Sequence, residues 1–473
     1  MFIGRNAELS RRTFMRRTAQ LGVAGAASAY ALDLAGISEA AAFASDGGYK
    51  ALVCVFLYGG NDHANTLVPY DGINHSRYAN IRREIAIPRS RLGNTALIHP
   101  QDQTLTDDLR FALAPTMPRL AARFNQGKMA ALLNVGPLVA PLTKAQYESS
   151  NTSKYPRPEK LFSHNDQQST WQSSAAEGAA SGWGGRMADL AQSSNTNSMF
   201  TAINATGNAV FLSGESSAPF KVTRRGATLV SALRRGRLYN SRTAHDALET
   251  ILQLRHQHVF EEDYATIVSR STTYGRFVND ALENSSVSTN FGSGNSLADQ
   301  LSIVARLIAA RSNLGVTRQV FLVSAGGFDH HNNLVGSHEA LLGKVDEAMD
   351  AFYRSTLELG VSDRVTTFTA SDFGRTLTSN GNGTDHGWGS HHFILGGAVH
   401  GGRFYGSAPK ISTISSDQVG RGRLLPSSSV DQYSATLASW LGVSSSELPS
   451  VAPNIGRFAT TDLGFMTKEQ KSR

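Results

Sequence analysis

The sequence predicts an α/β fold with a mostly parallel central sheet and helices on both of its faces. Residues 51–57 form a continuous apolar run that ends at a Gly-Gly pair, which is typical of a strand buried on both faces. Residues 319–370 contain a strand, a helix and a second strand in order, which indicates a βαβ unit. Polar residues follow each of these strands directly, at the edge where ligands bind in an open parallel sheet.

The other elements follow from the hydrophobic period of each segment. Residues 109–124 carry apolar residues at helical spacing, and residues 129–135 resemble a second buried strand. Inserted loops and helices are expected from about residue 144 to residue 296, because this stretch is first polar and rich in Ser, Asn and Gly and then helical over 243–281. The remaining predicted elements are helices at 297–313, 337–359 and 434–441 and strands at 319–324, 364–370 and 393–395.

The first 44 residues have the features of a twin-arginine signal peptide, which would leave residues 45–473 as the mature domain. The stretch SRRTFMR at 10–16 matches the export pattern, residues 21–37 are mildly apolar, and Ala42-Phe43-Ala44 supplies small residues for cleavage. The apolar part is shorter than the about 20 residues that cross a membrane, so no transmembrane anchor is expected in the mature chain. A basic amphipathic surface helix is the alternative interpretation.

Composition excludes several classes of protein. The chain has 473 residues, a formal net charge of +7 at pH 7 and one cysteine, Cys54, which lies inside the first apolar run. A buried, unreactive thiol is therefore expected. The arginine pairs are short and lack interleaved aromatic residues, so no nucleic-acid partner is predicted. No glycine cluster has the spacing of a dinucleotide or P-loop motif.

Acidic residues and histidines are concentrated after three predicted strands. The segments are GGNDH at 59–63, GGFDHH at 326–331 and SDFGR at 371–375. In a parallel sheet, Asp62, Asp329, His331 and Asp372 would converge on one rim, and the loop GTDHGWGSHH at 383–392 could fold over it. Any one of these residues alone is more often a turn or cap residue, but several in one place indicate a metal site.

The mixture of donors predicts the kind of ion and chemistry. Carboxylates and imidazoles suit one or two Zn, Mn or Fe ions better than Mg or Ca ions. Two such ions stabilise both oxygens of a phosphoryl or sulfuryl transfer. Arg375 is expected to bind the oxyanion of a substrate, because guanidinium matches phosphate and sulfate geometry.

The chain resembles the DUF1501 family, exported proteins of uncharacterised function related to the alkaline phosphatase and sulfatase superfamily. The matching stretches are VFLYGGND at 55–62, SHNDQQ at 163–168, GGFDHH at 326–331, SDFGRT at 371–376, GTDHG at 383–387, GGAVHGG at 396–402 and SVDQYSATLA at 429–438. The resemblance implies an alkaline-phosphatase-like core with a metal site at its rim. By order along the chain, it implies as metal ligands Asp62, Asp329, His331, Asp372 and His386, with Asp385 and His392 as additions.

The nucleophile is the point where the chain departs from the superfamily pattern. Active members use a Ser, Thr or modified Cys beside the metals, and Cys54 lies inside a strand, where it does not fit that role. Ser163, followed by His164, is the best candidate because it lies in one of the family motifs. The alternatives are that Ser163 caps a helix that continues through Trp171 and that water activated by the metal attacks instead.

These observations predict an exported, metal-dependent hydrolase that acts on phosphate or sulfate esters of an anionic small molecule or polymer. Its partner during export would be the twin-arginine translocase, and its location periplasmic or secreted. The alternative is a non-catalytic envelope protein that retains the fold and a structural metal and binds a partner.

Overall fold

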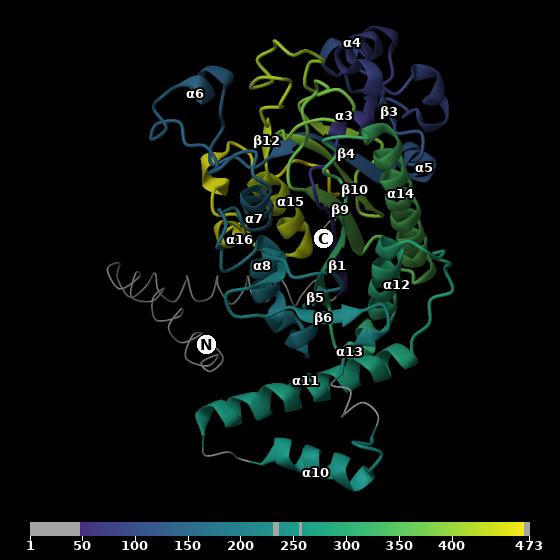
Figure 1. Cartoon of the computed structure of the whole chain (residues 1–473), viewed down its shortest axis with the longest axis vertical. Coiled ribbons are helices and arrows are strands. Elements are labelled where there is room, and N and C mark those ends of the chain that lie inside the picture. The colour runs from purple at the N-terminus through teal and green to yellow at the C-terminus, as the bar shows by residue number, and fades with distance from the viewer. Residues whose placement is uncertain (1–47, 230–235, 255–257, 468–473) are drawn as a thin grey trace, which may run out of the picture.

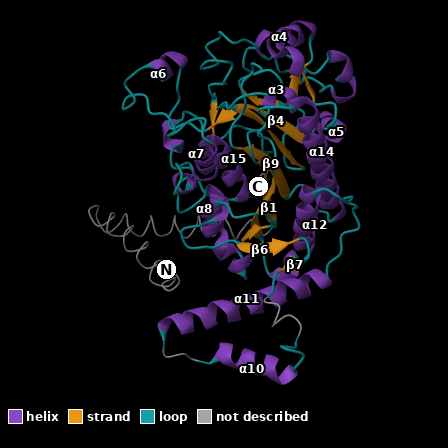
Figure 2. Cartoon of the chain, viewed as in Figure 1, coloured by secondary structure: helices purple, strands orange, loops and turns teal. Residues whose placement is uncertain are grey.

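A computed structural model describes residues 48–229, 236–254 and 258–467 of the chain. These residues form a ten-stranded sheet covered by helices on both faces, with a long helical hairpin that projects from the body (Figures 1 and 2). The predicted signal peptide at residues 1–44 lies outside the described residues, so the division at residue 45 stays a prediction.

The sheet is mostly parallel, as the sequence predicts. Its order is β11, β4, β10, β9, β1, β8, β5, β6 and β7, with β12 beside β4. Two of the described strands run against the others. Strand β10 is antiparallel to β4 and β9, and strand β7 is antiparallel to β6. The strands are β1 (Lys50–Leu57), β4 (Met129–Gly136), β5 (Ala202–Asn204), β6 (Phe220–Thr223), β7 (Gly226–Ala227), β8 (Arg318–Ala325), β9 (Val365–Ser371), β10 (Ser390–Gly396), β11 (Phe404–Gly406) and β12 (Ser428–Ser429), while β2 (Leu67–Pro69) and β3 (Phe111–Leu113) pair separately.

Strand β1 is central, and its side chains enter two different cores. Val53 and Val55 pack in the cluster that includes residues of α5 (Pro118–Asn125), α12 (Ser296–Ala309) and α14 (Leu334–Glu358). Cys54 and Phe56 pack in the cluster that includes residues of α8 (Trp183–Ala191), α15 (Val430–Leu441) and α16 (Leu448–Val451). Successive side chains of a strand point to opposite faces, so a strand covered by helices on both sides must be apolar throughout. This confirms the buried, unreactive Cys54, whose pKa is raised by burial.

Several predicted elements are confirmed and two are wrong. The strands at 51–57, 129–135, 319–324 and 364–370 and the helix at 337–359 are present with shifts of a few residues at their ends. The predicted helix at 109–124 is instead strand β3 followed by α5, because Pro118 can start a helix at its first position but cannot continue one. The predicted helix at 243–281 is two helices, α10 (Arg242–Gln253) and α11 (Val259–Glu283).

The remaining helices are α15 and several short helices. The predicted helix at 434–441 begins earlier, at Val430, because Ser429 and Gln432 form a capping box. The other helices are α3 (His63–Thr66), α4 (Gly72–Arg82), α6 (Lys144–Glu148), α7 (His164–Ser173) and α13 (Arg311–Leu314). In the described part of the chain, none of the helices combines the length and apolar character needed to cross a membrane.

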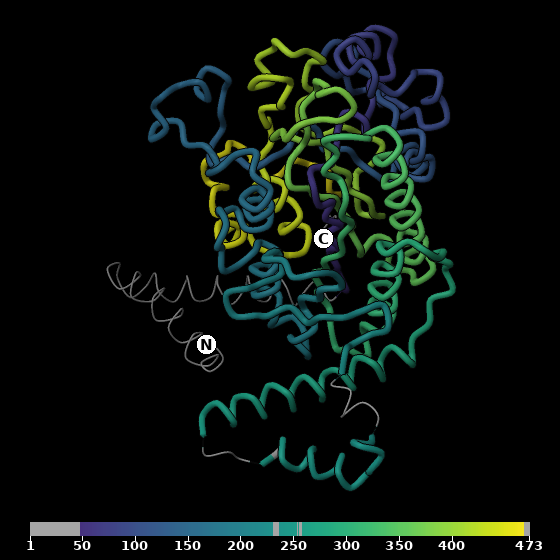
Figure 3. The backbone as a smooth tube through the Cα atoms, in the orientation of Figure 1, coloured from purple at the N-terminus to yellow at the C-terminus, as the bar shows by residue number. Residues whose placement is uncertain are grey.

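The chain path brings distant segments to one edge of the sheet. β1 pairs with β8 on one side and β9 on the other, and Leu57 lies opposite both Ala325 and Ser371. The three strands therefore end level with one another, and the loops that follow them emerge together. The tube in Figure 3 shows the chain returning to this edge from widely separated parts of the sequence.

Candidate metal centre

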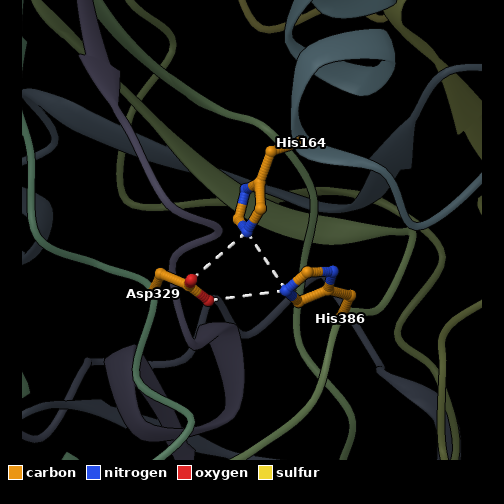
Figure 4. A group of neighbouring side chains, drawn as sticks. All are labelled: His164, Asp329 and His386. Atoms are coloured by element: carbon orange, nitrogen blue, oxygen red, sulfur yellow. Dashed lines mark hydrogen bonds and ion pairs between the residues drawn. The ribbon is translucent and has the colours of Figure 1, made fainter.

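Three side chains from distant loops point at one another beyond this edge of the sheet. His164 begins α7, Asp329 follows β8, and His386 lies in the loop before β10. The Nε2 atom of His164 is 3.1 Å from Nε2 of His386 and 3.4 Å from Oδ2 of Asp329, and Nε2 of His386 is 3.5 Å from Oδ1 of Asp329 (Figure 4). These ligand atoms all lie within 4.8 Å of one another, close enough to share one ion.

A third imidazole extends this group. Nε2 of His331 is 2.8 Å from Nε2 of His386 and 3.2 Å from Oδ1 of Asp329. We call His164, Asp329, His331 and His386 together the rim cluster. Its members are neither fully buried nor fully exposed, with side-chain exposures between 24% and 43%, so the cluster is open to solvent and to a ligand.

Each imidazole of the rim cluster is held through its other nitrogen. Nδ1 of His164 is 2.7 Å from Oδ2 of Asp372, and Nδ1 of His386 is 2.7 Å from the carbonyl oxygen of Phe162. Nδ1 of His331 lies 3.4 Å from Oδ1 of Asp385. A ring that donates its Nδ1–H in this way keeps a lone pair on Nε2, and this arrangement orients most metal-binding histidines. The three lone pairs face the same space.

The pKa values of His164 and His386 are shifted in opposite directions. The hydrogen bond to Asp372 raises the pKa of His164 above its ordinary value. Burial lowers the pKa of His386, which favours the neutral ring that a metal ligand needs. A proton competes more strongly for Nε2 of His164 than for that of His386.

Asp372 contacts the rim cluster through Nδ1 of His164, on the side of the ring away from the other cluster residues. It is fully buried, and its Oδ2 accepts hydrogen bonds from the Gly59 backbone N–H at 3.1 Å and from the side-chain amide of Gln168 at 2.8 Å, besides that of His164. Its Oδ1 is buried without a hydrogen-bond partner among the described residues. An unpartnered buried carboxylate oxygen is uncommon and leaves Asp372 with capacity for one further hydrogen bond or ion contact.

Asp329 is fixed by Arg375 rather than by a neighbouring ring. Nη1 of Arg375 donates to Oδ1 of Asp329 at 2.7 Å and to the carbonyl oxygen of Gly59 at 3.0 Å, while Nε and Nη2 donate to Thr384. Burial works to raise the pKa of Asp329, but Arg375 outweighs it and the pKa is lowered. Arg375 was expected to bind a substrate oxyanion; the structure buries its guanidinium completely and directs it at the protein instead.

Asp62 lies apart from the rim cluster, although it was expected to be a ligand. Its Oδ2 pairs with Nη2 of Arg82 at 2.6 Å and accepts from Oγ1 of Thr384 at 3.1 Å, and its Oδ1 accepts from the Asn65 backbone N–H as the cap of α3. Both charged side chains are buried. Burial acts to raise the pKa of Asp62, but Arg82 and nearby histidines lower it overall. Its oxygens are already used by the protein.

Two other expected ligands also have different surroundings. The side chain of His392 is in β10, buried against Trp171, and burial lowers its pKa to about 3. Asp385 does reach the rim, where it contacts His331 and also pairs with Arg421 at 2.7 Å. Of the expected ligands, Asp329, His331 and His386 meet at one point, Asp372 and Asp385 contact their imidazoles, and Asp62 and His392 do not reach it.

The expected nucleophile is tied to another side chain. Oγ of Ser163 donates to Oδ2 of Asp166 at 2.8 Å, at the start of α7. Ser163 occupies the cap position of this helix, but its hydroxyl makes no cap hydrogen bond to the backbone. The next residue, His164, is the one whose side chain enters the rim cluster, although it was expected to act beside a nucleophile rather than beside a metal.

Phe162 and Arg423 are two contributors that sequence reasoning missed. Phe162 has a φ of 72°, a strained conformation for a bulky residue, and in it the carbonyl oxygen accepts from His386. Nε of Arg423 donates to the carbonyl oxygen of His386 at 2.9 Å, and its guanidinium lies 4.7 Å from the centroid of the Phe162 ring. Neither role has a sequence signal, because one depends on a backbone torsion and the other on a distant loop.

The fold and the rim cluster together define an α/β protein with a candidate metal centre at the carboxyl edge of a mostly parallel sheet. Residues 49–441 match the model of the family "Protein of unknown function (DUF1501)". The chain therefore belongs to the DUF1501 family, which confirms the resemblance drawn from its motifs. No curated protein matches the chain.

Three solved structures illustrate what the chain is similar to. Ps i-CgsB in complex with k-i-k-neocarrahexaose is 11% identical, with 86% of this chain and 77% of that chain covered and a TM-score of 0.35. The lipoteichoic acid synthase LtaP from Listeria monocytogenes is 8% identical, with 86% and 75% covered and a TM-score of 0.31. The alkaline phosphatase of the Antarctic bacterium TAB5 is 10% identical, with 74% and 91% covered and a TM-score of 0.25. At these TM-scores, none of the likenesses supports an inference about activity.

Proposed function

We propose that the rim cluster binds one divalent cation and that the protein is an exported, metal-dependent hydrolase of phosphate or sulfate esters. The observation that carries the proposal is the convergence of three imidazole Nε2 atoms and the Asp329 carboxylate, with each ring held through Nδ1 by a separate acceptor. Histidines used only for packing have no reason to direct three lone pairs at one another.

The donor set favours zinc. Three nitrogen ligands and one carboxylate oxygen suit a tetrahedral Zn²⁺ site, with Mn and Fe as the next candidates. One ion is favoured over two, because Asp62 and His392, which a second ion would need, are engaged elsewhere.

The chain's own residues would position such a site and its substrate. A divalent ion supplies Lewis acidity, which polarises an ester and lowers the pKa of water. Asp372 holds the ring of His164, and Arg375 holds the carboxylate of Asp329. Because the Ser163 hydroxyl donates to Asp166, water is the attacking group that we propose.

Arg423 is the cation that we assign to the substrate anion. Its Nε is held by the carbonyl oxygen of His386, and its two terminal nitrogens make no hydrogen bond to the described residues. The guanidinium is only partly buried, beside the rim cluster. Two free N–H groups in a plane match the oxygens of phosphate or sulfate.

The proposal is tested by metal content and turnover on the same samples. Purified mature protein should contain about one zinc per chain by elemental analysis, and it should hydrolyse members of a panel of phosphate and sulfate monoesters. His386→Ala should lose both the ion and the turnover, whereas His400→Ala, at an exposed histidine away from the cluster, should keep both. Absence of stoichiometric metal would overturn the proposal, and stoichiometric metal without turnover would favour a non-catalytic binding protein.

A further inference from the structure

A groove of about 540 Å³ is lined by sequence neighbours and supporting residues of the rim cluster, although no residue of the cluster itself lines it. It runs between α7, the end of β1, the loop after β5 and the end of β8, and it is lined by residues from each. Gln168 connects the two regions, because it lines the groove and donates to Asp372, the residue that holds His164. Asn165, the neighbour of His164 in sequence, also lines it. A substrate whose reacting group is at the cluster would extend into this groove.

The residues that line the groove are almost all uncharged. Amide and hydroxyl side chains dominate it, and Glu177 is the only charged residue among the described residues that form it. The amide and hydroxyl residues of the groove include Asn165, Gln168, Gln172, Thr206, Asn208 and Ser324. With no lysine or arginine among these residues, the groove is poorly suited to a second anion.

Several of the lining groups still have hydrogen-bonding capacity. The side-chain amide of Asn165 has no protein partner among the described residues, and Gln168 uses its nitrogen but not its oxygen. The Tyr58 hydroxyl accepts from Gln172 at 3.4 Å, which leaves its own proton available. Burial raises the pKa of Tyr58 to about 12, so this hydroxyl stays protonated at neutral pH.

We propose that this groove binds the uncharged, polyhydroxylated part of the ester, a saccharide residue whose phosphate or sulfate group lies at the rim cluster. This inference rests on the proposed function for the position of the ester group. Sugar hydroxyls both donate and accept hydrogen bonds, as amide and hydroxyl side chains do. The ring of Tyr58 offers an apolar surface for the C–H face of a sugar. The volume is within the range of small-ligand sites.

Gly207 allows the groove to be blocked without disturbing the cluster. It lines the groove, its backbone is outside the left-handed region, and an added Cβ would meet no atom within 4 Å. Gly207→Trp should therefore fill the groove without strain, and Gly207→Ala is the matched control. Gly72→Trp, also with open space around the position and located on α4, controls for an added surface tryptophan.

Binding is measured by saturation-transfer NMR with neutral gluco-, galacto-, manno- and xylo-oligosaccharides, and zinc affinity is measured separately by calorimetry. We expect at least one oligosaccharide to bind the wild-type chain and Gly207→Ala, and to bind Gly207→Trp at least about tenfold more weakly. Zinc affinity should be the same in all four proteins. For ester turnover, Gly207→Trp should lose activity on a sugar phosphate or sulfate but keep it on 4-nitrophenyl phosphate or sulfate.

The two proposals fail in different ways. Absence of oligosaccharide binding, or equal binding by Gly207→Trp, overturns the saccharide groove even when zinc binds and 4-nitrophenyl esters are hydrolysed. Loss of binding in Gly207→Trp together with a zinc-free cluster supports the groove and overturns the metal site.

Discussion

At the scale of single residues, the carboxylates expected to bind metal divide into three roles. Asp329 is in the rim cluster, Asp372 orients one of its histidines from behind, and Asp62 closes a buried ion pair with Arg82. All three follow a strand at the same edge of the sheet, so sequence position alone cannot separate them. Their hydrogen-bond partners do separate the three roles. Two substitutions test the difference between Asp372 and Asp62.

Asp372→Asn should weaken zinc binding although Asp372 is not proposed as a ligand. The neutral amide oxygen of Asn accepts more weakly than the carboxylate from His164, Gln168 and the Gly59 N–H, so the imidazole is held less firmly in its orientation. Loss of such a supporting contact typically lowers metal affinity about 10–100-fold. Calorimetric titration with zinc measures this. Asp431→Asn, at another buried aspartate remote from the cluster, serves as the control, and unchanged affinity in Asp372→Asn would contradict the assignment.

Asp62→Asn should instead reduce stability and leave zinc affinity within about threefold of wild type. Removing one partner of a buried ion pair leaves the Arg82 charge unpaired, which costs about 3–5 kcal/mol in the free energy of unfolding. Denaturant unfolding measures the loss. Asp71→Asn controls for the cap, because Asp71 begins α4 in the same way without an arginine partner and Asn also caps well. A large loss of zinc affinity in Asp62→Asn would return Asp62 to the ligand set.

At the scale of elements, the end of one loop explains why two histidines were misplaced. The segment at 383–392 was expected to be a single loop over the metal site. Strand β10 begins at Ser390, so His391 and His392 are strand residues buried in the sheet, while Asp385 and His386 remain in the loop. The period of a strand then directs these two side chains away from the rim. An error of three residues in a strand boundary therefore placed one predicted ligand, His392, at the rim when it belongs to the sheet.

The contact between α14 and the start of α5 contains an unusual carboxylate. Asp346 of α14 accepts from the Leu120 N–H at 2.7 Å and from the backbone and side chain of Arg119. Burial raises its pKa to about 6, against an ordinary value of 3.8, although these hydrogen bonds act to lower it. The folded chain therefore binds this proton more tightly than the unfolded chain does. The contribution to stability is complete below pH 3.8 and is lost as the pH rises through about 6.

Asp346→Asn should remove this pH dependence. The wild-type free energy of unfolding should fall by about 2 kcal/mol more than that of the variant between pH 4 and pH 7, at about 1.4 kcal/mol per pKa unit. Urea unfolding at several pH values measures the difference. Glu347→Gln changes the next residue of α14, which also pairs with Arg119 but is exposed, and it should follow the wild-type curve. Parallel curves for Asp346→Asn and wild type would disprove the shift.

At the scale of the whole molecule, the rim cluster exists only after folding. Its residues come from α7, from the loop after β8 and from the loop before β10, and they meet because β1, β8 and β9 end level. A cation bound to such a site must be acquired by the folded chain. We therefore interpret the SRRTFMR stretch at 10–16 as a signal for the twin-arginine route, which moves folded proteins.

Replacing Arg11 and Arg12 by lysine should leave precursor in the cytoplasm, because the route recognises the arginine pair. Fractionation of cells that express the full-length chain, followed by immunoblotting, measures the ratio of precursor to mature protein. Lysine replacements at Arg16 and Arg17, which lie outside the pair, are the control. Undiminished mature protein beyond the inner membrane would refute the targeting prediction.

The sequence by itself determined the α/β class, the central strands and the rim at which polar side chains gather. A short apolar run that ends at a Gly-Gly pair, such as residues 51–57, is typical of a strand buried on both faces, and parallel strands place the loops that follow them at one edge. It also indicated Asp329, His331 and His386. The fold class and the central strands are confirmed because hydrophobic period and strand ends are local properties of a chain, whereas the assignment of metal ligands stays a prediction.

Only the tertiary structure decided which side chains gather in the rim cluster and which are paired with other protein groups. Asp62 forms an ion pair with Arg82, and the guanidinium of Arg375 donates hydrogen bonds to Asp329 and Thr384. His164 directs its Nε2 toward the rim because Asp372 accepts a hydrogen bond from its Nδ1. Each of these outcomes depends on a partner tens or hundreds of residues away. A side chain's type shows what it can bind, but which partner it binds depends on the groups that folding brings within hydrogen-bond distance.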